Sequence, residues 1–79
     1  MDGWRVVDGG EDRTEWERDD RFVRVVVRRT AGEEWAVTLD ALEQAPEGPA
    51  YARETHPTRE AATDRAEAWR EEYAHDRQG

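Results

Sequence analysis

The sequence predicts an α+β domain: an antiparallel meander sheet of four to five strands, with one C-terminal helix packed across one face. The first two-thirds of the chain alternates apolar and polar residues with a period of two between turn signals. The last third repeats with a helical period, and strands followed by a helix are typical of α+β domains. A chain of 79 residues supports one hydrophobic core, so residues 1–79 are expected to form a single domain.

Five segments have the alternation expected of strands, and short turn signals separate the first four of them. The strand segments are residues 4–8 (WRVVD), 13–18 (RTEWER), 21–29 (RFVRVVVRR), 34–40 (EWAVTLD) and 50–55 (AYARET). The turn signals are Gly9-Gly10, Asp19-Asp20 and Thr30-Ala31-Gly32. The order of the first and fifth strands in the sheet stays open.

The turn lengths predict how neighbouring strands pair. A two-residue loop at 19–20 places Trp16 opposite Val23 and Glu15 opposite Arg24. A loop of residues 9–11 then makes Glu15 the middle of a row that runs from Arg5 to Arg24. Such exposed pairs contribute about 0.2 to 1 kcal/mol each, so they specify register more than they stabilise the sheet.

The next hairpin is predicted to have a three-residue loop at 30–32 whose glycine takes the left-handed conformation. This loop pairs Val25 with Val37 and places Arg28 opposite Glu34. Both hairpins thus assign acidic or polar neighbours to the outward arginines of the third strand.

Residues 41–49 (ALEQAPEGP) interrupt the strand pattern. Asp40 followed by Glu43 fits a capping box for one helical turn that ends before Pro46, and a plain loop fits equally well. His56 and Pro57 form the expected turn into the helix.

A helix of about five turns is predicted from Thr58, which is a suitable N-cap. His75 and Arg77 are expected near its C-terminal end, where positive charge is favourable. Its inward stripe is Ala62, Ala66, Trp69 and Tyr73. Because two of these residues are small, the helix can approach the sheet closely, and Trp16 and Trp35 are expected to fill the remaining space.

The expected core is small and depends on large aromatic side chains. Its candidate members are Val6, Val7, Val23, Val25, Val26, Val27, Val37, Leu39, Leu42, the tryptophans and several alanines. Of the four tryptophans, Trp4 is expected to be the most exposed, because it lies near the end of an edge strand.

Charge and composition indicate a cytoplasmic protein. The formal net charge is -8, and all twelve basic residues are arginine. An acid-rich surface without lysine is typical of proteins from the cytoplasm of extreme halophiles, where salt screens the repulsion. The absence of cysteine excludes disulfides, zinc-thiolate sites and thiol nucleophiles. The sequence has no membrane-spanning stretch and no signal peptide, so no membrane association is expected.

No residue pattern predicts catalysis or a bound cofactor. His56 and His75 lie nineteen residues apart without metal-ligand spacing. Acidic residues such as Glu15 and Glu17 are expected on a solvated face with nothing to raise their pKa values. The chain is therefore predicted to be non-enzymatic, with no catalytic residues, no cofactor and no metal.

The basic strand raises the alternative of RNA or single-stranded nucleic acid binding, because Arg24 and Arg28 share a strand face with Phe22. The acidic residues expected on that same face and the net charge of -8 oppose binding to phosphates. A ladder of ion pairs is the favoured interpretation of these arginines.

Apolar residues within the charged outward face suggest a surface for association. The candidate interaction surface consists of Phe22, Arg24, Val26, Arg28 and Ala36, with Val7 as a further apolar neighbour. A patch of this kind, or an unpaired sheet edge, can dock a second protein. The predicted function is a non-enzymatic protein-interaction or self-association module of a halophilic cytoplasm, with a homodimer or another protein as the partner.

Two resemblances accompany these predictions. The meander, the loop and the helix start TREAA at 58–62 resemble small stand-alone acidic haloarchaeal proteins of unknown function. The segment 23–73 is similar in layout to the strand-strand-strand-helix core of HicB-type antitoxins, a family that binds a toxin ribonuclease, usually beside a DNA-binding extension. Since residues 40–49 (DALEQAPEGP) depart from the compact link of that family, no residue roles are carried over.

Overall fold

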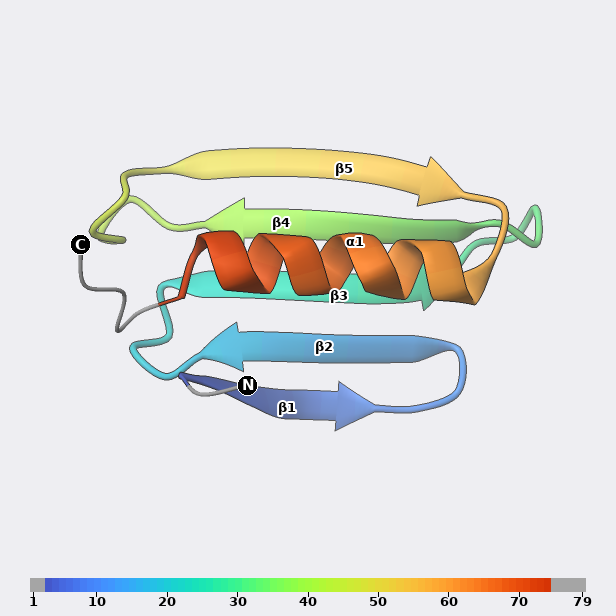
Figure 1. Cartoon of the computed structure of the whole chain (residues 1–79), viewed down its shortest axis with the longest axis horizontal. Helices are drawn as coiled ribbons and strands as arrows, with labels where there is room; N and C mark the ends of the chain where they lie inside the picture. The colour runs from blue at the N-terminus through green and yellow to red at the C-terminus, as the bar shows by residue number, and fades with distance from the viewer. Residues whose placement is uncertain (1–2, 75–79) are drawn as a thin grey trace.

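A computed structural model describes residues 3–74, which form five strands and one helix (Figure 1). The elements are β1 (Trp4–Gly9), β2 (Arg13–Arg18), β3 (Val23–Arg29), β4 (Trp35–Ala41), β5 (Ala50–His56) and α1 (Arg59–Glu72). The strands form one antiparallel sheet in the order β1-β2-β3-β4-β5, so β1 and β5 are its edges. The predicted α+β meander is confirmed.

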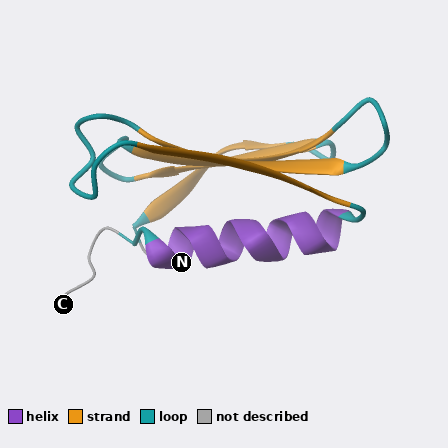
Figure 2. Ribbon diagram, turned by 90° about the horizontal axis from the view of Figure 1, so that it is seen from above, coloured by secondary structure: helices purple, strands orange, loops and turns teal. Residues whose placement is uncertain are grey.

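The molecule has two layers, because α1 covers one face of the sheet and leaves the other uncovered (Figure 2). We call the helix-covered side the inner face and the opposite side the outer face. The helix lies mainly over β3 and β4 and makes fewer contacts with β5. Alternating residues of β3, namely Val23, Val25 and Val27, are buried on the inner face.

The three predicted registers are wrong by two residues, and the direction of the error is the same in each. Trp16 pairs with Val25 instead of Val23, and Val25 pairs with Leu39 instead of Val37. A shift of two residues keeps every side chain on its predicted face, because strand side chains alternate with a period of two. The inner and outer faces were therefore assigned correctly in β2, β3 and β4 although the partners were not.

Longer turns cause these shifts. The turn between β2 and β3 has four residues, with Arg21 at a φ of 70° and its N–H bonded to the carbonyl of Arg18. In the turn between β3 and β4 the left-handed residue is Glu33, at a φ of 66°, and not the predicted Gly32. The hydroxyl of Thr30 accepts a hydrogen bond from the Glu34 N–H at 3.3 Å, which stabilises that turn.

The edge strand β1 contains an irregularity that the sequence did not predict. Arg5 pairs with Glu17, and the register shifts between Val6 and Asp8. A β-bulge of this kind bends an edge strand and disrupts the regular presentation of its unpaired hydrogen-bonding groups. The two edges of the sheet therefore differ: β1 is bulged, and β5 pairs with β4 without a register shift.

The helix begins where it was predicted and ends earlier. The Thr58 side chain accepts a hydrogen bond from the Ala61 N–H at 3.1 Å, as an N-cap does. The helix ends at Glu72, so it is shorter than the predicted five turns, and His75 and Arg77 lie outside the described residues. The predicted inward stripe is confirmed: Ala62, Ala66 and Trp69 are buried, and Tyr73 packs against the core.

The core differs from the prediction at its margins. Trp4 is only 9% exposed and belongs to the core cluster, although it was expected to be the most exposed tryptophan. Val6 and Val7 are 60% and 51% exposed, because they lie on the bulged edge strand beyond the helix, and Leu42 is exposed after the end of β4. Trp16 and Trp35 are half-buried against the core, as expected.

Between β4 and β5 the chain forms turns without a helical turn, so the loop alternative was correct. Ala45 is buried in the core, and its N–H donates to the carbonyl of Leu42 at 3.0 Å. This buried alanine fixes a loop that otherwise consists mainly of exposed residues.

Candidate interaction surface

The outer face is a lattice in which three rows of side chains run across the strands. The registers define the rows: Arg13, Arg28, Ala36 and Thr55; then Asp8, Glu15, Val26, Thr38 and Arg53; then Arg5, Glu17, Arg24, Asp40 and Tyr51. Residues that are direct cross-strand partners have Cβ atoms about 4.5 to 5.5 Å apart, so each row is a line of touching neighbours.

A continuous chain of ion pairs occupies the β1, β2 and β3 part of this lattice. Glu17 bonds the Arg5 guanidinium at 2.6 Å and lies 3.7 Å from that of Arg24. Arg24 also contacts Glu15 at 3.0 Å, and Glu15 contacts Arg13 at 3.0 Å. Arg13 then reaches Asp8 at 3.5 Å, beside the β-bulge. The predicted ladder is present, with Glu17 in the central place that was assigned to Glu15.

The ladder lowers the pKa of Glu17. The hydrogen bond from Arg5 is the main cause, partial burial opposes it, and the positive charges of Arg5, Arg24 and Arg21 add to the lowering. Glu17 therefore stays ionised to a lower pH than an isolated glutamate. An ionised, paired carboxylate between two arginines fixes the alignment of three strands.

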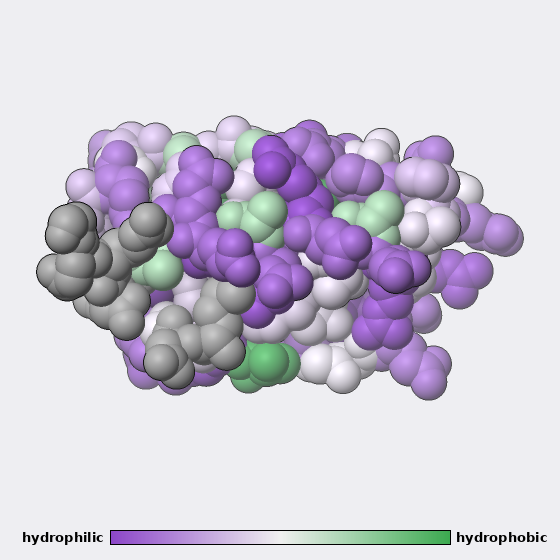
Figure 3. Space-filling view, in the orientation of Figure 1, coloured by the Kyte–Doolittle hydropathy of each residue, from purple (hydrophilic) through white to green (hydrophobic). Residues whose placement is uncertain are grey.

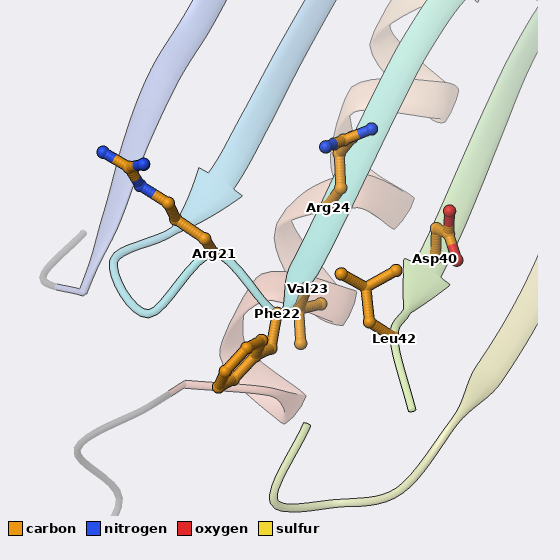
Figure 4. Close-up of a pocket in the computed structure, with 6 residues that line it drawn as sticks. All are labelled: Arg21, Phe22, Val23, Arg24, Asp40 and Leu42. Carbon is orange, nitrogen blue, oxygen red and sulfur yellow. The ribbon is translucent and has the colours of Figure 1, made fainter. Parts of the chain in front are cut away.

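The predicted apolar patch is not assembled as an open surface. Phe22 lies in the turn before β3 and packs against the core cluster, and its side chain points away from Arg24 and Asp40 (Figure 4). The Phe22 N–H donates to the Asp20 carboxylate at 2.9 Å, so the turn sets the direction of this residue and breaks the strand alternation. Phe22 on the outward face is thus a correction to the prediction.

The other members of the candidate surface do lie on the outer face. Val26 is half-buried between Glu15 and Thr38, and Ala36 is 0% exposed between Arg28 and Thr55. The structure therefore brings Arg24, Val26, Arg28 and Ala36 together, but their apolar atoms offer little open area.

A shallow depression lies at the end of this face where β3 begins and β4 ends (Figure 4). It is lined by Arg21, Phe22, Val23, Arg24, Asp40 and Leu42. Its volume of about 10 Å³ is close to what a single water molecule needs. Small-molecule sites are usually clefts of about 300 to 1,000 Å³, so this depression is too small for such a ligand.

The sequence predicted an unpaired sheet edge as a docking surface but left open which strand forms it, and β5 is one of the two edges. Tyr51 is 68% exposed on the outer face, and Arg53 stands two residues further along on the same face. On the inner face, Glu54 bonds Arg65 of α1 at 3.2 Å and His56 at 3.1 Å, which anchors the strand to the helix. Regular alternation from Ala50 to His56 was the available signal for this edge.

The sequence reasoning missed Arg18, which is 0% exposed. Its Nε donates to both oxygens of Asp20 at 3.0 and 3.1 Å, and its Nη1 donates to Glu47 at 2.5 Å and to the Tyr73 carbonyl at 2.8 Å. Burial lowers the pKa of Arg18, but the hydrogen bonds that it donates to Asp20 and Glu47, together with their negative charges, outweigh burial and raise the pKa above the ordinary value. One guanidinium thus joins two loops to the C-terminal end of α1.

Helix arginines cover the inner-face tryptophans at the rim of the core. Arg70 lies 4.2 Å above the ring of Trp16, and Arg59 lies 5.7 Å above that of Trp35. Burial lowers the pKa of Arg70, although the neighbouring charges of Glu67 and Glu71 oppose the change. Cation-π contacts of this kind close the core edges with charged side chains.

The helix side of the molecule is largely hydrophilic (Figure 3). The exposed helix acids are Glu60, Asp64, Glu67, Glu71 and Glu72. The outer-face lattice holds five arginines and four acidic residues, which gives it a net charge of +1 in a chain of net charge -8. The negative excess is therefore concentrated away from the outer face.

Within residues 3–74, no group of three or more histidine, aspartate or glutamate side chains is placed to hold a metal ion. In the described part of the chain, no helix is long and apolar enough to cross a membrane, since α1 is both too short and too polar.

Residues 1–72 match a family of unknown function, DUF7543. The chain belongs to this family. No curated protein and no solved structure matches the chain. The DUF7543 match covers all five strands and the whole of α1, so the family and the fold described above coincide.

Proposed function

We propose that this DUF7543 protein is a non-enzymatic association module that forms a homodimer through the free edge of β5. The observation that carries the proposal is the contrast between the two sheet edges. β1 is bulged at Val7, and β5 is a straight edge of seven residues without a bulge or a proline. A regular, unpaired edge strand offers its free N–H and C=O groups to a further strand.

The helix does not obstruct this edge, because α1 lies mainly over β3 and β4 (Figure 1). Two copies related by a twofold axis perpendicular to the sheet would pair their β5 strands antiparallel. The product is one continuous sheet with both helices on the same side. The partner in this proposal is therefore a second copy of the chain, and closed twofold dimers are the commonest symmetric assembly.

Side-chain complementarity selects one register. At the axis of such a dimer, one residue faces its own copy. Centring on Arg53 or on Glu54 places like charges directly opposite, which is destabilising. Centring on Ala52 avoids this, and it places Arg53 opposite Tyr51 of the partner subunit on the outer face. A guanidinium stacks well on an aromatic ring, so this register is the one we propose.

The test is the oligomeric state of the purified chain in 1 M KCl, measured by sedimentation equilibrium over micromolar to millimolar concentration. We expect a monomer-dimer equilibrium that Arg53→Glu weakens by about tenfold or more, because each loss of about 1.4 kcal/mol is a factor of ten. The matched control is Arg28→Glu, which makes the same charge change on the same face two strands from the edge. Equal effects of the two substitutions, or a monomer throughout, would contradict the proposal.

A third variant, Val6→Asp, tests the opposite edge, where Val6 is exposed. Loss of the dimer in this variant together with a normal dimer in Arg53→Glu would place the interface on β1 and refute the β5 proposal.

Nucleic acid binding through Phe22, Arg24 and Arg28 has less support as a second function. Phe22 packs against the core, and Arg24 is engaged by two glutamates. Retention of RNA at moderate salt that Arg24→Ala abolishes would favour that function over association.

A further inference from the structure

We propose that the outer face carries a phosphate-binding site between Arg28 of β3 and Arg53 of β5. This inference does not require the dimer, although the two proposals share Arg53 of the edge strand β5. The ligand class is a phosphate dianion, either free or as the terminal phosphate of a small molecule.

The first observation is that these two arginines have no partners within residues 3–74. Neither Arg28 nor Arg53 makes a hydrogen bond, an ion pair or an aromatic contact there, whereas Arg5, Arg13 and Arg24 on the same face are all paired with acids. The chain contains twenty acidic residues against twelve basic ones. Although acidic residues outnumber basic ones, no carboxylate of residues 3–74 lies within ion-pair distance of these two arginines.

The second observation is the composition of the space between them. In the lattice, Arg28 is followed by Ala36 and Thr55 in one row, and Arg53 is preceded by Thr38 in the next row. β3 and β5 are separated by two strand spacings, about 10 Å, so the long arginine side chains flank β4 from both sides. Ala36 between them is 0% exposed, so a bound anion would lie over the two arginine head groups and not in a hollow of β4. The two threonine hydroxyls are hydrogen-bond donors.

The third observation is a charge conflict at this corner. Arg28 is the direct cross-strand partner of Arg13, and like charges directly opposite destabilise a sheet. Arg13 forms ion pairs with Glu15 and Asp8, whereas Arg28 has no acidic partner among residues 3–74. A bound anion would relieve this repulsion, so binding is coupled to stability.

Together these features match a doubly charged tetrahedral oxyanion better than a carboxylate. Two guanidinium groups supply two positive charges and forked N–H donors, and a terminal phosphate carries a charge of about -1.5 to -2 at pH 7 with three acceptor oxygens. In the proposed dimer, stacking of Arg53 on a tyrosine ring leaves its in-plane N–H groups available, so the two proposals are compatible.

The experiment is a titration of the full chain with sodium phosphate at pH 7.5, in which sodium chloride keeps the ionic strength constant, followed by amide chemical shifts. We expect saturable shifts at residues of β3, β4 and β5 around Ala36. Substitution of either arginine, as Arg28→Gln or Arg53→Gln, should weaken binding by about tenfold or more, the effect of losing one charge-assisted hydrogen bond. Thr38→Val should weaken binding by a smaller factor.

The control is Arg21→Gln, an exposed arginine in the turn before β3, at the end remote from Arg28. It should bind phosphate as the unmodified chain does. The proposal would be overturned if no saturable shifts occurred. It would also be overturned by equal phosphate affinity of the three site variants and the Arg21→Gln control. Arg28→Gln lies outside the proposed dimer edge, so a loss of phosphate binding with an unchanged dimer mass separates the two proposals.

Two further titrations distinguish the sources of phosphate. A nucleoside monophosphate carries a terminal dianion, and a single-stranded oligonucleotide without terminal phosphates carries only backbone monoanions. Binding of phosphate and the monophosphate, with weak binding of the oligonucleotide, is expected. Arginine-dependent binding of the oligonucleotide that exceeds both would replace the small-molecule site by a nucleic acid surface.

Discussion

Arg18 is the residue on which three parts of the chain converge. Its guanidinium is buried and contacts the turn after β2 through Asp20, the β4-β5 loop through Glu47, and the end of α1 through the Tyr73 carbonyl. A buried charge costs free energy unless it is paired and hydrogen-bonded. The Nε and Nη1 atoms of Arg18 meet that requirement, and the buried Nη2 forms an ion pair with Asp20 at 2.8 Å without a hydrogen bond. The carboxylates of Asp20 and Glu47 in turn rely on this guanidinium to balance their negative charges.

Removal of the Arg18 charge is expected to be strongly destabilising. Arg18→Met leaves Asp20 and Glu47 without their shared cation, and breaking one partner of a buried ion pair costs about 3 to 5 kcal/mol. Arg18→Lys keeps the charge but loses the forked N–H donors. Its free energy of unfolding should therefore lie between that of the original chain and that of Arg18→Met. Urea unfolding at constant salt measures the free energies.

The control for this substitution is Arg29→Met, which removes an arginine whose contact with Asp12 is exposed and 3.9 Å long. Exposed pairs contribute about 0 to 1 kcal/mol, so this variant should stay close to the original stability. Similar decreases in the free energy of unfolding for Arg29→Met and Arg18→Met would mean that the buried contacts of Arg18 contribute no more to stability than a surface ion pair.

The strands and helix illustrate what the sequence could predict. The period-two alternation of β3 predicted its buried valines, and Thr58 predicted the start of α1, because both depend on local chemistry. The registers failed because they depend on turn length, and turn residues such as Arg21 and Glu33 adopt left-handed conformations that favour glycine.

The candidate surface was predicted only in part, because strand alternation predicts the face of a strand residue but not the position of a turn residue. Arg24, Val26 and Arg28 follow strand alternation and lie on the outer face. Phe22 belongs to a turn, so alternation does not apply to it. Arg18 shares the inward parity of Trp16, and this signal was available, but its acidic partners come from loops whose positions no periodicity predicts.

The ladder that joins β1, β2 and β3 predicts a dependence of stability on pH. The pKa of Glu17 in the folded chain is lower than its ordinary value of 4.5. A carboxyl whose pKa is lowered by folding contributes stability that is present above the unfolded pKa and is lost as pH falls through the folded pKa. Acidification below about 4.5 should therefore weaken the sheet as Glu17 is protonated.

Glu17→Gln removes this titration. We expect the variant to be less stable than the original chain at pH 7 and to lose less stability between pH 5 and pH 3, as urea unfolding at a series of pH values would measure. Glu43→Gln, at an exposed glutamate in the β4-β5 loop, is the control and should leave the pH profile unchanged. A profile of Glu17→Gln that matches the original chain at every pH would show that the ladder does not contribute.

The whole molecule combines a net charge of -8 with a face of net charge +1, and salt acts on these two features over different distances. The ion pairs of the ladder are 2.6 to 3.7 Å long, comparable with the Debye length of about 3 Å at 1 M salt. Repulsion between acids on the helix side and in the loops extends over longer distances, where a Debye length of about 30 Å at 0.01 M leaves it unscreened and 1 M removes it. Salt should therefore weaken the repulsion more than it weakens the ladder.

The expected result is that the free energy of unfolding in urea rises as KCl is increased from about 0.01 M to 1 M, because the compact state confines more negative charge than the unfolded chain does. Urea is the appropriate denaturant, since guanidinium chloride is itself a salt. A matched variant, Glu67→Gln with Glu71→Gln, lowers the negative charge of the helix face and should reduce the dependence on salt. Stability that is insensitive to salt, or that falls as salt is added, would show that the ladder dominates and would refute adaptation of this chain to high salt.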